Sequence, residues 1–329
     1  MAKLGIGVIG CGGLAMSLAK HLTTIEDVKL ITGADPSTER RKIFGAEFGV
    51  SVYSHHRRVL SQPDVDAVLV VTPNDSHARI AIEALETGKH VFCEKPMAMN
   101  VAQCDRMLAA AERAGLKLMV GQVLRLFPIF AKVKEIIQSG VLGNPFGMFT
   151  IRSSFGGGFL GTWRQYKRKV GGMLLEINAH ELDYMRHIMG EVESVSAQMG
   201  HFLDNDLEYE DLAFVELKFR NGGIGALYTS LSSAIGDYSG VIQCKEGTLT
   251  HGGFSRDITY AKFGQEPTVL ARSDIQTEDP YRYELRSFVE SVLNGAPMVF
   301  DGHDGRAAVE IAAAAYLSAK RGRPVSLPL

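Results

Sequence analysis

The chain has 329 residues, a formal net charge of −2 and a charged fraction of 22%. This balance is ordinary for a globular protein and offers no basic excess for nucleic acid, and no apolar run reaches the roughly 18 residues of a membrane span. The length suits two domains. The four cysteines lack Cys-x-x-Cys spacing, so we expect free buried thiols in a cytoplasmic protein. Met1-Ala2-Lys3 leads directly into an apolar run, so we expect no signal peptide.

The first third of the chain alternates short apolar runs with helical patterns. Near-continuous apolar strands joined by helical crossovers predict an α/β domain whose parallel, doubly wound sheet is covered on both faces. The strands are expected at 4–9, 28–34, 67–71, 90–93 and 117–120, and the helices at 14–22, 40–48, 77–86 and 101–114.

The pattern changes from about residue 122, where alternating strands and hairpins predict an α+β domain with a large, mainly antiparallel sheet. Arg220-Asn221-Gly222-Gly223 is typical of a hairpin turn. We expect domains of residues 1–123 and 124–329. Helices are expected at 130–138, 173–189, 281–293 and 305–320, strands at 145–155, 192–202, 213–220, 224–230, 241–249 and 258–263, and a Gly-rich basic stretch at 156–172.

A glycine-rich turn, Gly10-Cys11-Gly12-Gly13-Leu14-Ala15, joins the first strand to the first helix and fits Gly-x-Gly-x-x-Ala. In this context Gly10 permits a tight turn, Gly12 lets the backbone approach a pyrophosphate, and Ala15 lets helix and strand pack closely. Amide groups at the start of the helix would hold the phosphate charge. The turn therefore predicts dinucleotide binding, and the alternative is a turn that only tightens packing.

An acidic residue, Asp35, ends the second strand, where a carboxylate commonly accepts hydrogen bonds from the adenosine ribose. A carboxylate there repels a ribose 2′-phosphate and so favours NAD. Arg40 and Arg41 follow, and their guanidinium groups could contact a phosphate or lie solvated on the helix. NAD is the predicted cofactor, with NADP as the alternative.

Glu94-Lys95-Pro96 ends the fourth predicted strand, at the sheet edge where ligands of such folds bind. A lysine at this place can orient a substrate hydroxyl, and burial beside a cationic ring lowers the pKa of such an amine. The alternative is an exposed turn.

Two neighbouring histidines, His55 and His56, are expected at the surface.

In combination these motifs resemble the glucose-fructose oxidoreductase / inositol dehydrogenase (Gfo/Idh/MocA) family of NAD(P)-dependent oxidoreductases. The resemblance implies an N-terminal Rossmann domain and a C-terminal domain with a large open sheet, through which members pair as homodimers or homotetramers. The matching pieces, in the family's order, are 10–15, Asp35, Thr72-Pro73-Asn74 with His77, 94–96, Arg125, 140–143, Trp163-Arg164, Gly171-Gly172 leading to His180, and 301–318.

The segment from Gly171 to Asp183 is similar to the family's Asp-x-Gly-x-His helix, and His180 matches its catalytic histidine. By resemblance, His180 exchanges a proton with the substrate hydroxyl and Lys95 hydrogen-bonds the same oxygen. Glu176 stands where most members have Asp and Asn178 where many have Gly, which puts the substrate in doubt more than the reaction type. We expect no metal, because Glu176 and His180 have no further ligands at suitable spacing.

The predicted function is hydride transfer between a nicotinamide cofactor and a hydroxyl or keto group of a sugar or cyclitol. Trp163 and Arg164 offer an aromatic face and a cation to such a ring, although a solvated basic loop is the alternative. A different class of function is a cofactor-sensing regulatory protein without turnover. Another alternative is reduction of a keto-sugar nucleotide or elimination through transient oxidation.

The expected partners are a small sugar or polyol and further copies of the chain, with neither nucleic acid nor membrane. The expected site residues are Lys95, His180 and Glu176 for catalysis; Gly10, Gly12, Gly13, Leu14, Ala15, Asp35, Arg40, Thr72, Pro73, Asn74, His77, Glu94, Lys95 and Gln122 for cofactor; and Lys95, Arg125, Trp163, Arg164, Glu176 and His180 for substrate.

Overall fold

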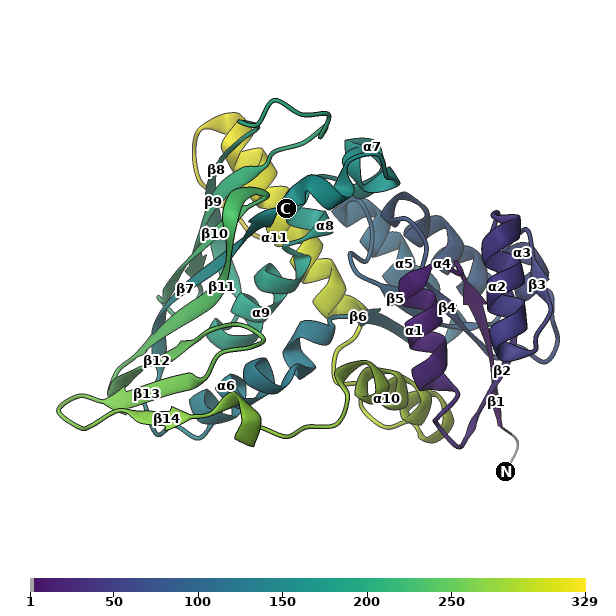
Figure 1. Ribbon diagram of the computed structural model, residues 1–329, viewed down its shortest axis with the longest axis horizontal. Helices are drawn as coiled ribbons and strands as arrows, with labels where there is room; N and C mark the ends of the chain where they lie inside the picture. The colour runs from purple at the N-terminus through teal and green to yellow at the C-terminus, as the bar shows by residue number, and fades with distance from the viewer. Residues whose placement is uncertain (1–2) are drawn as a thin grey trace. The chain divides into compact units, whose positions relative to one another are not determined.

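The computed structural model describes residues 3–329 and divides into two compact units (Figure 1). The first runs to Gln122 and includes Tyr281–Val309, and the second comprises Val123–Pro280 and Glu310–Leu329. The expectation for the start of the chain falls partly on Met1 and Ala2, which lie outside the described residues.

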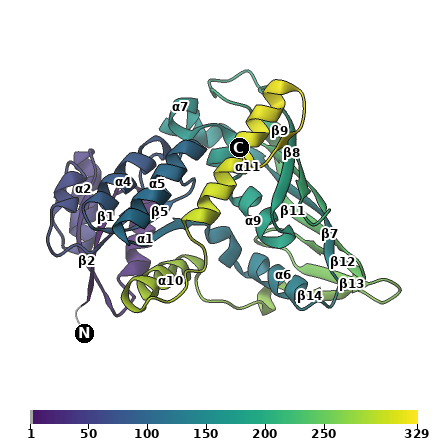
Figure 2. The same cartoon turned by 180° about the vertical axis from the view of Figure 1, so that it is seen from behind.

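The first unit contains a six-stranded sheet of order β3-β2-β1-β4-β5-β6, in which every pair is parallel. This confirms the doubly wound prediction. Helix α1 lies on one face, and α4 and α5 lie on the other (Figures 1 and 2). Its strands are β1 (Leu4–Ile9), β2 (Val28–Ala34), β3 (Val52–Tyr53), β4 (Ala67–Val70), β5 (His90–Glu94) and β6 (Leu118–Gly121), and its helices include α1 (Gly13–Leu22), α2 (Thr38–Phe48), α3 (Arg57–Leu60), α4 (His77–Glu86), α5 (Val101–Ala114) and α10 (Pro280–Asn294).

Local signals explain where the helices of this unit begin and end. The side chains of Ser37 and Asn100 accept hydrogen bonds from amides in the first turns of α2 and α5. Both helices end at a glycine with positive φ, Gly49 and Gly115. The bounds of α2 and α5 are therefore set by residues at the helix ends themselves.

The second unit contains a nine-stranded sheet of order β14-β13-β12-β11-β7-β10-β9-β8-β15. Only β7 and β10 pair in parallel within the described sheet, so the mainly antiparallel prediction is confirmed. The strands are β7 (Pro145–Phe155), β8 (Val192–Gly200), β9 (Leu212–Phe219), β10 (Ile224–Ser230), β11 (Ser232–Cys244), β12 (Gly247–His251), β13 (Ile258–Lys262), β14 (Thr268–Leu270) and β15 (Val325–Ser326).

Two turns of this sheet test the hairpin predictions. The predicted turn at Gly222 is confirmed, since its φ is +86° and the Phe219 amide donates to the Gly223 carbonyl at 2.9 Å. The single strand expected over 241–249 is wrong, because the chain reverses between Cys244 and Gly247, which face each other across β11 and β12. The turn residues are Lys245 and Glu246, and the polar Lys245-Glu246-Gly247 is the local signal that the single-strand prediction passed over.

The helix expected over 173–189 is also interrupted. It forms α8 (Met173–Glu176) and α9 (Ala179–Met189), separated by Ile177 and Asn178. The fully buried Asn178 amide donates to Glu181 Oε2 at 2.9 Å and accepts from Thr229 Oγ1 at 3.0 Å. The local contact with Glu181 and the tertiary contact with Thr229 of β10 hold Asn178 in a non-helical conformation, with φ −96° and ψ 4°.

Helices α6 (Pro128–Gln138) and α9 lie against one face of the nine-stranded sheet (Figures 1 and 2). Side chains that alternate away from this face leave large apolar residues exposed: Phe149 is 43% exposed, Phe214 53% and Ile224 65%. A hollow of about 560 Å³ is lined by Phe149 and Ile224 together with neighbouring residues of the sheet. Within residues 3–329, no helix combines the length and apolar character needed to cross a membrane.

Candidate functional site

The glycine turn of the first unit has the conformation that the sequence predicts. Gly10 has a φ of +91°, and a Cβ atom there would lie 2.2 Å from the Val71 carbonyl oxygen. Gly12 precedes α1 with an ordinary φ of −77°, and its Cβ position meets only Arg40 Nη1, at 3.8 Å. Gly13 faces open space, Leu14 is 41% exposed and Ala15 is fully buried. The turn is therefore closed toward β4 and open on the side of Gly12 and Gly13.

The predicted ribose acid, Asp35, is held beside this turn by backbone amides. Its Oδ2 accepts from the Cys11 amide at 2.9 Å and its Oδ1 from the Ser37 amide at 2.8 Å. Arg40 Nη1 lies 3.9 Å from Oδ2 on a side chain that is 56% exposed. Arg41 instead donates to the Asp35 and Pro36 carbonyls, which braces the loop after β2. The buried carboxylate and the glycine turn thus form one rigid unit.

His77 joins the loop after β4 to the loop after β5. The ring is 1% exposed, with Nε2 at 2.8 Å from the Thr72 carbonyl oxygen and Nδ1 at 2.8 Å from that of Pro96. Carbonyl oxygens only accept, so both contacts are hydrogen bonds only when both ring nitrogens carry a proton. Thr72 and Pro73 precede the short helix at Asn74–Ser76, in which Asn74 is buried.

Glu94 and Lys95 follow β5 at the same edge of the sheet. The Glu94 carboxylate accepts from the Lys95 amide at 3.2 Å. Burial raises the pKa of the Glu94 carboxyl to about 7, while the Lys95 ammonium opposes this shift. Gln122 follows β6, the neighbouring strand, and is 1% exposed. Neither Nε2 nor Oε1 of Gln122 has a hydrogen-bond partner in the described part of the chain.

In the second unit, the structure brings together two predicted substrate residues. Arg164 Nε donates to Glu176 Oε1 at 2.6 Å, and Arg164 Nη2 forms an ion pair with the same oxygen. The guanidinium carbon lies 4.3 Å from the centre of the Phe159 ring. Trp163 begins the short helix Trp163–Gln165 and is half-buried. Glu176 is therefore a buried carboxylate with a fixed cationic partner.

Helix α8, which carries Glu176, is held by residues distant in sequence. The Met173 amide donates to Glu210 Oε1 at 2.8 Å and the Leu174 amide to the Tyr316 hydroxyl at 3.0 Å. That hydroxyl donates to Glu210 at 2.5 Å. A Cβ atom at Gly172, whose φ is +109°, would lie 2.3 Å from the Tyr316 hydroxyl. Glu210 and Tyr316 thus cap α8, and neither was predicted from the sequence because no local motif marks them.

His180 lies in the first turn of α9 and is half-buried. Its neighbour Glu181 accepts from Tyr238 at 2.7 Å and pairs with Arg152 at 3.4 Å. One turn later, Asp183 accepts from Arg125 Nε at 2.7 Å and Nη2 at 2.5 Å, and both side chains are buried. The predicted substrate residue Arg125 therefore anchors α9.

A pocket of about 430 Å³ lies within the second unit. Arg152 stacks on the Tyr238 ring at 4.5 Å, and Arg256 pairs with Asp237. No local motif in the sequence marks this pocket, because its residues are dispersed over β7, β11 and the loop after β12. Its lining is Arg152, Ser153, Ser154, Gly236, Asp237, Tyr238, Gly252, Phe254, Ser255 and Arg256.

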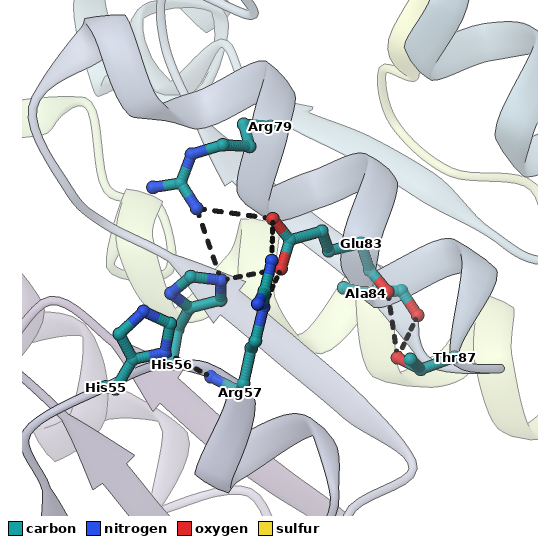
Figure 3. A network of polar contacts seen from close by, with 7 residues as sticks. All are labelled: His55, His56, Arg57, Arg79, Glu83, Ala84 and Thr87. Atoms are coloured by element: carbon teal, nitrogen blue, oxygen red, sulfur yellow. Dashed lines mark hydrogen bonds and ion pairs between the residues drawn. The ribbon is translucent and has the colours of Figure 1, made fainter.

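Away from the glycine turn, Glu83 on α4 is surrounded by cations from α3 and α4 (Figure 3). It accepts from Arg57 Nε at 2.9 Å, contacts Arg79 Nη1 at 3.3 Å and lies 2.9 Å from His56 Nε2. The prediction that His56 lies at the surface is wrong, because the His56 side chain lies beneath these residues and is only 7% exposed. Hydrogen bonding to Arg57 lowers the pKa of Glu83 to about 2, and burial lowers the pKa of His56.

Within residues 3–329, no group of three or more His, Cys, Asp or Glu side chains could hold a metal ion. The expected cofactor residues belong to the first unit, whereas Arg125, Trp163, Arg164, Glu176 and His180 belong to the second.

Comparison with known proteins gives the family. Residues 4–122 match the model of the Gfo/Idh/MocA oxidoreductase family with an NAD-binding Rossmann fold, and residues 134–327 match the C-terminal alpha/beta domain of that family. A myo-inositol 2-dehydrogenase of Thermotoga maritima is 31% identical over 341 residues, which cover 98% of each chain. The NAD(+)-dependent scyllo-inositol 2-dehydrogenase of Bacillus subtilis is 28% identical over 97% of this chain and 95% of its own.

Solved structures share the whole fold. An aldose-aldose oxidoreductase from Caulobacter crescentus, complexed with glycerol, has a TM-score of 0.90 at 27% identity, covering 99% of this chain and 100% of its own. A levoglucosan dehydrogenase in complex with NADH and L-sorbose has a TM-score of 0.90 at 21% identity, covering 100% of both chains. The chain therefore belongs to the Gfo/Idh/MocA family of NAD(P)-dependent oxidoreductases, with an NAD-binding Rossmann domain followed by the family's C-terminal domain.

Proposed function

We propose that the protein is an NAD-dependent dehydrogenase or reductase acting on a hydroxyl or keto group of a sugar or cyclitol. The observation that carries the cofactor assignment is the buried Asp35 carboxylate, fixed by two amides beside a glycine turn that is open at Gly12. The substrate class follows from the inositol dehydrogenases that the chain resembles over nearly its full length.

The residues of the first unit fit a dinucleotide. Amides at the start of α1 would hold the pyrophosphate, and Asp35 would accept the ribose hydroxyls. NAD is favoured over NADP because a 2′-phosphate would stand against the Asp35 carboxylate, although the exposed Arg40 offers a partial counter-charge. When bound, the nicotinamide supplies the hydride chemistry.

The chain's own residues would manage the proton of the substrate oxygen. We assign the proton exchange to His180, because an imidazole titrates near neutral pH. The Lys95 ammonium would donate a hydrogen bond to the same oxygen and stabilise its developing negative charge. Glu176, paired with Arg164 beside the Phe159 ring, would accept a hydrogen bond from a neighbouring substrate hydroxyl.

The test is the change in nicotinamide absorbance with NAD and with NADP over a panel of cyclitols, aldoses and anhydrosugars. We expect turnover with a polyol and a preference for NAD. Lys95→Ala should bind NADH as wild type does yet lose about a hundredfold or more in kcat. The matched control is Lys29→Ala, which removes an exposed lysine of β2 and should change neither quantity.

Tight cofactor binding without turnover on the whole panel would favour a cofactor-sensing regulatory protein instead. Normal turnover by Lys95→Ala would contradict the site assignment.

We also propose that a second copy of the chain covers the exposed apolar face of the nine-stranded sheet. Large exposed apolar patches mark association surfaces, and Phe149, Phe214 and Ile224 form such a patch. Sedimentation should give the mass of a dimer or tetramer, and Ile224→Glu should dissociate it. A monomeric mass for the wild-type protein at micromolar concentration would contradict this proposal.

A further inference from the structure

The side-chain amide of Gln122 is buried without a hydrogen-bond partner at an edge of the first sheet. It is 1% exposed, and both Nε2 and Oε1 are unsatisfied among the described residues. Its backbone amide donates to the Val120 carbonyl at 2.8 Å, so the main chain at this point is fixed. The unsatisfied groups are therefore confined to the side chain.

A buried amide in this state is unusual, because removing a polar group from water carries a penalty that native proteins offset with hydrogen bonds. The same chain shows the usual outcome at Asn178. That fully buried amide donates to Glu181 and accepts from Thr229. Gln122 has the same functional group and a similar degree of burial, so a donor and an acceptor from a ligand would complete it.

The position of Gln122 in the sheet indicates which part of a bound dinucleotide would contact its side chain. It follows β6, and the preceding Gly121 pairs with Glu94 at the end of β5. The strand order β3-β2-β1-β4-β5-β6 puts Asp35 on one side of the glycine turn and Gln122 on the other. A dinucleotide with its adenosine ribose at Asp35 and its pyrophosphate on the glycine turn has its nicotinamide half over β4, β5 and β6.

We propose that the Gln122 side chain recognises the carboxamide of the nicotinamide. Gln122 Nε2 would donate to the carboxamide oxygen and Gln122 Oε1 would accept from the carboxamide NH2 group, an amide-to-amide pair. This pairing fixes the rotation of the ring and so makes Gln122 a positioning residue. The inference rests on the proposed dinucleotide binding and goes beyond it by naming the recognised group.

Calorimetric titration with three ligands tests this role without turnover. NAD+ carries the carboxamide, 3-acetylpyridine adenine dinucleotide keeps the carbonyl but replaces NH2 with methyl, and ADP-ribose lacks the ring. We expect wild type to bind NAD+ about tenfold more tightly than the acetylpyridine analogue. Gln122→Leu should bind NAD+ at least about tenfold more weakly, nearly abolish the preference over the analogue, and bind ADP-ribose as wild type does.

Two further measurements keep a folding defect apart from lost recognition. Gln122→Leu should unfold at a temperature no lower than wild type, because it removes an amide that makes no hydrogen bond in the free protein. The control Gln62→Leu changes an amide of the same unit that donates to the Arg58 carbonyl at 2.9 Å, and it should leave all three affinities unchanged.

Equal weakening of NAD+ and its analogue by Gln122→Leu, or no weakening of either, would overturn the inference. A raised KM for the polyol with an unchanged NAD+ affinity would also overturn it and assign Gln122 to the substrate. If wild type bound neither ADP-ribose nor NAD+, the proposed dinucleotide binding itself would fail.

Discussion

Two glycines of the turn between β1 and α1 are required for different reasons: Gly10 for folding and Gly12 for cofactor binding. Gly12→Ala places a methyl group where the backbone of such a turn approaches the pyrophosphate. Within the protein that methyl has room, because its nearest neighbour is Arg40 Nη1 at 3.8 Å. We therefore expect Gly12→Ala to fold normally and to lose cofactor affinity.

The expected changes in stability follow from the φ angles of the two glycines and the space around them. Gly12 has a φ of −77°, which alanine adopts without strain, so the free energy of unfolding should change by no more than about 1 kcal/mol. Overlap with a phosphate should weaken NADH binding about a hundredfold, or about 2.8 kcal/mol. Gly10→Ala differs, because its φ is +91° and its Cβ would lie 2.2 Å from the Val71 carbonyl oxygen. It should destabilise the unit by about 3 kcal/mol or more.

The assay compares thermal unfolding and NADH fluorescence titration for Gly10→Ala, Gly12→Ala and Gly158→Ala. Gly158→Ala is the matched control, since Gly158 is an exposed residue of the second unit and its Cβ would meet no atom within 4 Å. It should bind NADH within about threefold of wild type. Wild-type affinity in Gly12→Ala would refute the placement of the pyrophosphate on this turn.

Two further predictions concern the caps and charges of the fold. Gly172→Ala should lower the free energy of unfolding by about 3 kcal/mol and reduce kcat, because its methyl group would meet the Tyr316 hydroxyl at 2.3 Å and displace α8. The control Gly222→Ala has a similarly positive φ of +86° but open space around its Cβ, so it should lower the free energy of unfolding by only about 1 to 2 kcal/mol. Equal losses in denaturant titrations would show that the cap on α8 is unimportant. The pKa of Glu83, lowered from 4.5 to about 2, means that its ionised form stabilises the fold fully above pH 4.5 and that this contribution is lost as pH falls toward 2. Glu83→Gln should therefore lower the melting temperature at pH 7 but less so at pH 3, and a difference that stays constant with pH would contradict this linkage.

The sequence predicted the features that depend on neighbouring residues. The glycine turn, the buried parallel strands and the hairpin at Gly222 each have their signal within a few residues, because strand periodicity and turn chemistry are local properties. The resemblance to the family rests on several such motifs that occur in a fixed order along the chain. The doubly wound sheet and its glycine turn can therefore be predicted from the sequence alone.

Only the tertiary structure decided the contacts that join distant parts of the chain. Arg125 pairs with Asp183 across 58 positions, and Tyr316 meets Glu210 across 106. The break between α8 and α9 has the same origin, since Thr229 holds Asn178 from a strand 51 residues away. The burial of His56 depends on Glu83 from another helix. Helical periodicity describes which face of a helix is apolar, but it carries no information on which distant polar group will satisfy a buried one, and that pairing sets the geometry of the candidate site.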